Sequence, residues 1–206
     1  MSAARTEWTI DRRVHIQFAR SITQAFSRSN AAQTDEGDLA LASYLRVCCS
    51  EFQAFCSALY LEAVEAIRTH LNDPDASGRP RVPAAMSAVL VNTFTYQTKL
   101  SRGNPNMANL IADFDRLGVN LRRAVIIAMG LVSADDIKAL DEELLDARNQ
   151  LLHGEVRMGS LRAGRPPQVV GEDRINLWVQ SLDRLADTLD RAVTRDVSAP
   201  LGSPPW

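Results

Sequence analysis

The sequence has few of the features that mark a secreted or membrane-spanning protein. Its three cysteines, Cys48, Cys49 and Cys56, lie close together in one apolar segment. An odd, clustered set favours buried thiols in a reducing compartment over a disulfide framework. The N-terminal residues contain no apolar stretch of signal-peptide length, and no uninterrupted apolar span reaches membrane length. We therefore expect a cytoplasmic protein that does not engage a membrane.

Sequence motifs for metal and nucleotide binding are also missing. No cysteines have the C-x-x-C spacing of a zinc site, and His15 and His70 have no metal-ligand neighbours in the sequence. A glycine loop of the Walker type does not occur either. We expect neither a metal site nor a cofactor.

The composition fits one globular domain with an ordinary surface. Hydrophobic residues make up 46% and charged residues 23% of the 206 residues, and the net charge is −2. This charge argues against a surface that is basic all over. It still allows a local basic patch, which is the feature that binds phosphates.

No segment alternates as a strand would and no repeat is evident, whereas helical periodicity runs through most of the chain. Residues 9–28 repeat an apolar residue every four positions, at Ile10, Val14, Phe18, Ile22 and Phe26. A longer run predicts a helix from Asp38 to Leu71. Further helices are predicted over 83–99, 107–117, 120–131, 133–153 and 175–194. The fold class is all-α, a helical bundle around the long second helix.

We divide the chain into an N-terminal helix with its connection (1–37), a helical domain (38–196) and a tail (197–206) that is expected to be disordered. The apolar stripes of the predicted helices give the expected core. Its members are Phe52, Phe55, Leu59, Leu140, Leu144, Leu151, Trp178 and Leu182.

The stretch "LLDARNQLLHGE", residues 144–155, closes the predicted helix 133–153. On a helical wheel of about 100° per residue, Arg148, Asn149 and His153 share a sector with Leu145 and Leu152, away from the core-facing residues. Two leucines among polar residues predict a surface that a second copy covers in a two-fold dimer. The alternative is structural, because basic residues and a glycine commonly end a helix.

The string "RNQLLH" resembles the arginine–polar–histidine signature of the HEPN superfamily. "SEFQAFCSALYLEAV" (50–64) is similar to the long helix of that family, and "RGNPNMANLIADFDRLGVNL" (102–121) to the connecting region of its RiboL-PSP-HEPN branch. The resemblance covers roughly residues 38–193. It implies an all-α homodimer and a metal-independent endoribonuclease that serves as a toxin or an abortive-infection effector. Glu155 replaces a tyrosine that nucleotide-modified HEPN toxins carry, which puts that form of control in doubt.

The residues in this signature suit metal-free RNA cleavage, in which the RNA supplies its own 2′-hydroxyl nucleophile. His153 can transfer protons near neutral pH, and Arg148 can hold two phosphate oxygens. Asn149 can orient the imidazole or bind phosphate. By resemblance Glu51 faces the site, although it also fits a solvated surface position.

A basic surface for the RNA backbone is expected around the signature. The arginines concerned are Arg122, Arg123, Arg157, Arg162 and Arg165. Such a cluster suits phosphate binding, but it is also typical of an ordinary solvated face.

Three functions follow from these patterns, and the endoribonuclease is the first. The second is a catalytically inactive HEPN module that binds RNA or a partner protein such as an antitoxin or another defence component. The third is a helical DNA-binding regulator, but no short helix-turn-helix with a basic second helix is evident. The presence of Arg148, Asn149 and His153 favours RNA cleavage over the other two functions.

Overall fold

The computed structural model describes residues 1–28, 35–74, 81–96, 98–100, 107–128, 172–202 and 204–206. Every regular element in these ranges is a helix, so the predicted all-α helical bundle is confirmed. The predicted helix 133–153, with Leu140, Leu144 and Leu151 of the expected core, lies outside the described residues. Among the described helices, none is long and apolar enough to cross a membrane.

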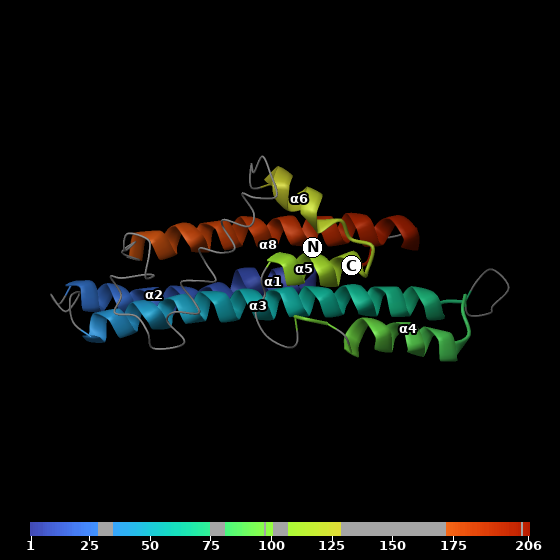
Figure 1. Cartoon of the computed structure of the whole chain (residues 1–206), viewed down its shortest axis with the longest axis horizontal. Coiled ribbons are helices and arrows are strands. Elements are labelled where there is room, and N and C mark those ends of the chain that lie inside the picture. The colour runs from blue at the N-terminus through green and yellow to red at the C-terminus, as the bar shows by residue number, and fades with distance from the viewer. Residues whose placement is uncertain (29–34, 75–80, 97, 101–106, 129–171, 203) are drawn as a thin grey trace.

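The bundle is built around α3 (Asp35–Asn72), the longest helix described (Figure 1). It is preceded by α1 (Ala3–Glu7), the π-helical turn η1 (Trp8–Arg12) and α2 (Arg13–Arg28), which runs antiparallel to it. The helices α4 (Ala84–Tyr96), α5 (Met107–Asp115) and α6 (Leu121–Ala128) follow. The last helix, α8 (Glu172–Leu201), runs in the same direction as α3.

The core lies where α3 meets α8 and the N-terminal helices. Phe52, Phe55, Leu59, Trp178 and Leu182 are all buried, as the helical stripes predict. Further along α3, Tyr60 contacts Phe114 of α5, with ring centroids 5.4 Å apart in a T-shaped arrangement. The aromatic residues of α3 therefore also anchor a helix from the middle of the sequence.

The N-terminal helices belong to the same core as α3 and α8. Trp8 of η1 is fully buried against Phe52 and Phe55, with ring centroids 5.9 and 5.5 Å away. Its indole N–H donates to Asp183 of α8 at 2.9 Å. The segment over 1–28 therefore packs into the domain rather than standing beside it.

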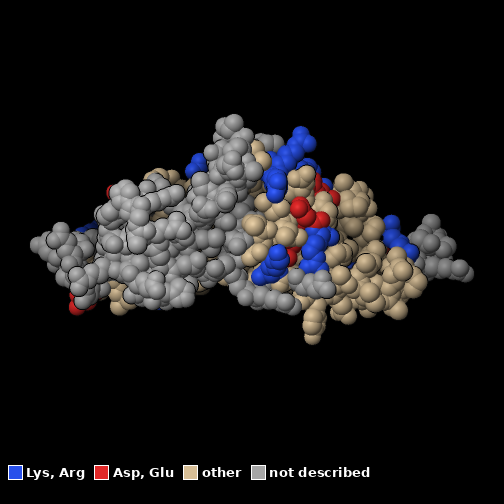
Figure 2. Space-filling model, viewed as in Figure 1, with Lys and Arg blue, Asp and Glu red and all other residues tan. Residues whose placement is uncertain are grey.

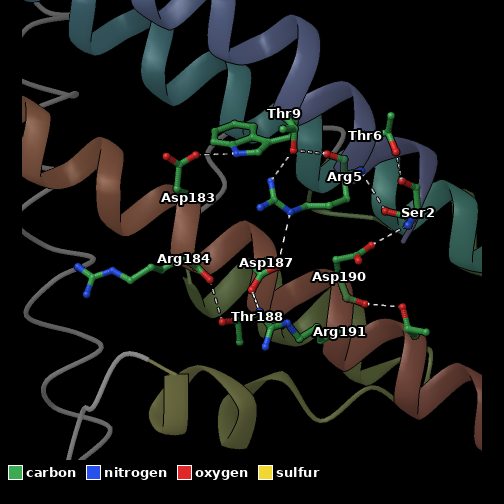
Figure 3. Close-up of polar contacts among 12 residues, drawn as sticks. Ser2, Arg5, Thr6, Thr9, Asp183, Arg184, Asp187, Thr188, Asp190 and Arg191 are labelled. Carbon is green, nitrogen blue, oxygen red and sulfur yellow. Dashed lines mark hydrogen bonds and ion pairs between the residues drawn. The ribbon is translucent and has the colours of Figure 1, made fainter.

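A line of aspartates on α8 faces this N-terminal segment (Figure 3). Asp183, Asp187 and Asp190 recur at steps of four and three, which places them on one side of the helix. The backbone N–H of Ser2 donates to Asp190 at 3.0 Å, and Arg5 lies 3.8 Å from Asp187. Together with Trp8 and Asp183, these contacts fix α1 and η1 along α8.

The C-terminal end differs from the prediction. The tail expected to be disordered from Val197 continues α8 to Leu201, because the apolar row through Leu189 and Val193 extends to the buried Val197. Gly202, with φ at 71°, follows the last turn in the left-handed conformation that suits glycine. The Trp206 indole N–H then donates to Thr194 at 3.1 Å.

Candidate functional site

The predicted site residues divide into those the structure describes and those it does not. Glu51 lies on α3, and Arg122 and Arg123 lie on α6. The signature residues Arg148, Asn149 and His153 and the loop arginines Arg157, Arg162 and Arg165 fall in 129–171, outside the described residues.

Glu51 points from the middle of α3 toward η1 and α2, where it meets two basic side chains. Its Oε1 lies 2.8 Å from Nδ1 of His15, and its Oε2 accepts a hydrogen bond of 3.1 Å from Nη1 of Arg12. Arg12 also donates from Nη2 to Glu7 at 2.8 Å. We call Arg12, His15 and Glu51 the Glu51 cluster. In this setting Glu51 is not a solvated surface glutamate.

The three side chains of the Glu51 cluster differ in exposure. Arg12 and Glu51 are only 14% and 18% exposed, whereas His15 is 63% exposed. With its proton on Nδ1, His15 donates to Glu51 and leaves Nε2 free to accept or release a proton in solvent. A carboxylate that fixes the tautomer in this way is a common partner of a proton-transferring histidine. The cluster therefore has the chemistry of an acid–base site at the molecular surface.

The sequence alone did not reveal Arg12 and His15 as neighbours of Glu51. In the sequence, His15 lacks the companions that a metal ligand needs, and no neighbouring residue links it to Glu51. The contact joins residues 36 and 39 positions apart, and it depends on how η1 and α2 lie against α3. The available signal was the pairing of basic residues on the first predicted helix with an acidic residue on the second.

Arg122 and Arg123 are both exposed on α6. This helix is capped by Asn120, whose side chain accepts the Arg123 backbone N–H at 3.2 Å. Within the described part of the chain neither guanidinium has an ion-pair partner, so both can contact phosphates. Figure 2 shows basic side chains at the edge of the molecule where α6 lies, with acidic ones interspersed nearby.

The two described parts of the predicted site lie on different elements. Glu51 faces η1 and α2, whereas α6 packs against α8 and α5. No contact joins the Glu51 cluster to Arg122 or Arg123 among the described residues. The structure therefore does not bring these predicted residues together.

A hollow of about 220 Å³ lies between α2, α3 and α8 and has two arginines in its lining, which makes it a candidate for binding an anion. Its two arginines are already paired, Arg13 with Asp183 at 3.3 Å and Arg20 with Glu172 at 3.4 Å. These pairs neutralise the cations that a phosphate would need. In the described ranges no group of three or more His, Cys, Asp or Glu side chains is placed to hold a metal ion.

Compared with protein-family models, with curated proteins and with solved structures, the chain gives no match. The resemblance to the HEPN superfamily therefore stays a prediction from the sequence, and the structure shows an all-α bundle.

Proposed function

We propose that this protein is a metal-independent endoribonuclease of the HEPN type, working as a homodimer. The structural observation behind the proposal is the Glu51 cluster, in which a guanidinium from η1 and an imidazole from α2 meet a carboxylate on α3, the helix that the resemblance links to the family. The sequence adds the "RNQLLH" string, with a second arginine and histidine. These are the side-chain types that metal-free RNA cleavage requires.

The reaction forms a bond between the 2′-oxygen and phosphorus and breaks the bond between phosphorus and the 5′-oxygen. One group must take the proton from the 2′-hydroxyl, and another must give a proton to the leaving 5′-oxygen. His153 lies at the end of a predicted helix, where the macrodipole favours its protonated form, so we assign it the acid role. Arg148 stabilises the negative charge on the phosphate oxygens.

The base role is open, and His15 is the described residue best suited to it. Glu51 accepts from Nδ1 of His15 and so leaves Nε2 available for the 2′-hydroxyl proton. Asn149 assists by orienting the imidazole of His153 or by binding phosphate. The exposed Arg122 and Arg123, with the loop arginines Arg157, Arg162 and Arg165, hold the RNA backbone.

Partners follow from the same proposal. RNA is the substrate, and a second copy covers the predicted surface around Leu145 and Leu152. By resemblance the enzyme acts as a toxin or abortive-infection effector, controlled by an antitoxin or another defence-system protein. Glu155 stands where modified toxins of this family carry tyrosine, so we expect control by binding rather than by nucleotide transfer.

The alternative is a catalytically inactive HEPN module that binds RNA or a partner protein. One observation favours it: both oxygens of Glu51 are already engaged by Arg12 and His15. A carboxylate with both oxygens engaged can also have a purely structural role, in which it holds α3 against η1 and α2. This module would bind RNA without cutting it.

The chain has three histidines, and comparing them tests the proposal directly. We expect His153→Ala to reduce RNA cleavage by about 10²–10⁴-fold, the usual worth of a general acid or base. Arg148→Ala should cost a comparable factor, and Asn149→Ala less. His15→Ala should also reduce cleavage, whereas His70→Ala, in the last turn of α3 and outside the Glu51 cluster, serves as the matched control.

Cleavage of total RNA is measured in EDTA by mapping the ends of the products. The products should carry 2′,3′-cyclic phosphates, and substrates with a 2′-deoxy residue at the cut should resist. Wild-type protein that binds RNA but leaves it intact would favour the inactive module. Equal cleavage by wild type and His153→Ala would remove that histidine from the mechanism.

A further inference from the structure

The face of α2 that turns away from the core is unusually apolar. Four apolar residues, which we call the α2 stripe, form this face: Ile10 of the preceding η1 is 60% exposed, and Val14, Phe18 and Ile22 of α2 are 57%, 68% and 41% exposed. The opposite side of the helix carries the buried Ile16, Ala19 and Thr23. The four-residue repeat that predicted this helix therefore faces solvent, and a smaller set of residues packs on α3.

The α2 stripe is a contiguous row rather than a scatter of exposed apolar residues. Residues four apart form a ridge along a helix surface, and such ridges pack into the grooves of a second helix. Single exposed apolar side chains need no explanation, but a continuous row on one helix marks an interaction surface. With 16 residues, α2 is about 24 Å long, enough for a helix–helix contact.

The charges that flank the stripe indicate its partner. Asp11 lies at its N-terminal end and Arg28 at its C-terminal end, and both are exposed. Neither has an ion-pair partner in the described part of the chain. A surface with an acidic residue at one end and a basic residue at the other complements a second copy of itself when the two run antiparallel.

We propose that the α2 stripe is a two-fold contact between two copies of this chain. The two α2 helices run antiparallel, with the axis near residue 20. Phe18 then packs on Ile22 of the second copy, and Asp11 lies across from Arg28. This contact uses a different helix from the predicted surface around Leu145 and Leu152, and it does not depend on RNA cleavage.

The charge arrangement gives the first test, because each pair occurs twice in a two-fold contact. Asp11→Arg and Arg28→Asp should each weaken self-association by roughly tenfold, since attraction becomes repulsion at both ends. The double variant should recover wild-type association. Phe18→Asp should halve the mass of the assembly, whereas Leu177→Asp, an exposed leucine on α8, should leave it unchanged. Sedimentation equilibrium over micromolar concentrations measures these masses, because a single-helix contact lies at the low end of interface sizes.

Cross-linking gives the second test, which depends on the register. The three native cysteines are buried, so a cysteine introduced on α2 is the accessible thiol among the described residues. In the proposed register Ser21 lies about 3 Å along the axis from its counterpart, and Ala25 about 15 Å from its own. Ser21→Cys should form an intermolecular disulfide and Ala25→Cys should not. Both residues are exposed on the stripe side of α2.

The outcomes separate the possible occupants of this face. Equal cross-linking at both positions would indicate a parallel pairing and overturn the proposal. A wild-type protein that stays monomeric, or an assembly that Phe18→Asp leaves unchanged, would assign the stripe to another partner and also overturn it. Because these readouts need no RNA, they stay informative if the protein cleaves nothing.

Discussion

At the residue scale, Glu51 is the most informative position described. It lies on a helix that must bury one side and expose another, and its carboxylate is the link between that helix and Arg12 and His15. Arg12 is only 14% exposed, and its Nε is buried without a hydrogen-bond partner among the described residues. The guanidinium therefore depends on Glu51 and Glu7 for compensation of its charge.

Replacing Glu51 with Gln tests this dependence. The substitution keeps the shape but removes the charge, so Arg12 retains one carboxylate instead of two. We expect the free energy of unfolding to fall by about 1–3 kcal/mol, as for the loss of a charged, partly buried partner. Glu65→Gln is the matched control, because the Glu65–Arg68 pair is on the exposed side of the same helix. Urea unfolding with an unchanged m-value measures both; equal small losses would contradict a special role for Glu51.

Tyr60 carries a second prediction at this scale, which concerns pH. Burial raises the pKa of Tyr60 to about 12, with nearby Arg116 lowering it and Asp113 raising it. Its hydroxyl donates to the carbonyl of Phe94 at 3.1 Å. An unfolded tyrosine loses its proton near pH 10, whereas the folded one keeps it to about pH 12. The contribution of Tyr60 is therefore complete below pH 10 and declines as the pH rises through this window.

Tyr60→Phe removes that titration. The variant should be less stable at neutral pH, because it loses the hydrogen bond to Phe94. Between pH 10 and pH 12 its stability should fall less steeply than that of wild type. Urea midpoints at several alkaline pH values give both slopes. Parallel slopes would mean that Tyr60 ionises alike in the folded and unfolded chain.

At the element scale, the N-terminal helices are as much a part of the hydrophobic core as α3 and α8. Trp8 fills the space between Phe52, Phe55 and α8 and has no exposed surface. Trp8→Ala should lower the free energy of unfolding by about 3–5 kcal/mol, as usual for a large buried aromatic. Trp206→Ala is the matched control, because that indole is only partly buried at the end of the chain. Thermal or urea unfolding compares the two, and losses of equal size would place Trp8 outside the core.

The helices themselves were largely predictable, and the errors have physical causes. Steps of three and four along α3, α5 and α8 identified each helix and its core side, because burial of an apolar stripe selects that spacing. In α2 the apolar repeat predicted the helix correctly, but it did not indicate which side of the helix faces the core. Its four-residue stripe faces solvent, since a row of apolar side chains predicts a covered surface without saying what covers it. The last turns of α8 were not predicted, because residues 197–206 show no packing pattern of their own in the sequence.

At the scale of the whole molecule, the fold class followed from periodicity, while the Glu51 cluster required three-dimensional packing. The partners of Glu51 come from a segment that the sequence placed outside the main domain. Nothing local in the sequence marks a contact of this kind, because it depends on the angle at which α2 crosses α3. The same holds for the aspartates of α8. Their spacing on one side of the helix is evident in the sequence, but their contacts with α1 and η1 could not be predicted from it. The enzymatic proposal likewise combines residues that lie far apart in the sequence, those of the Glu51 cluster and those of the "RNQLLH" string.

The π-helical turn η1 has an evolutionary consequence. The core residues Ala4, Trp8 and Ile16 and the partly buried Arg12 are spaced four apart, and in a regular α-helix such a row drifts by about 40° at each step. The wider turn between Trp8 and Arg12 takes up part of this drift, so that Trp8 and Ile16 both face inward. Loss of one codon in this turn would rotate α2 by about 100° relative to Trp8. We therefore expect a single insertion or deletion in η1 to move the α2 stripe to another side of the bundle, and with it the self-association that we propose for this surface.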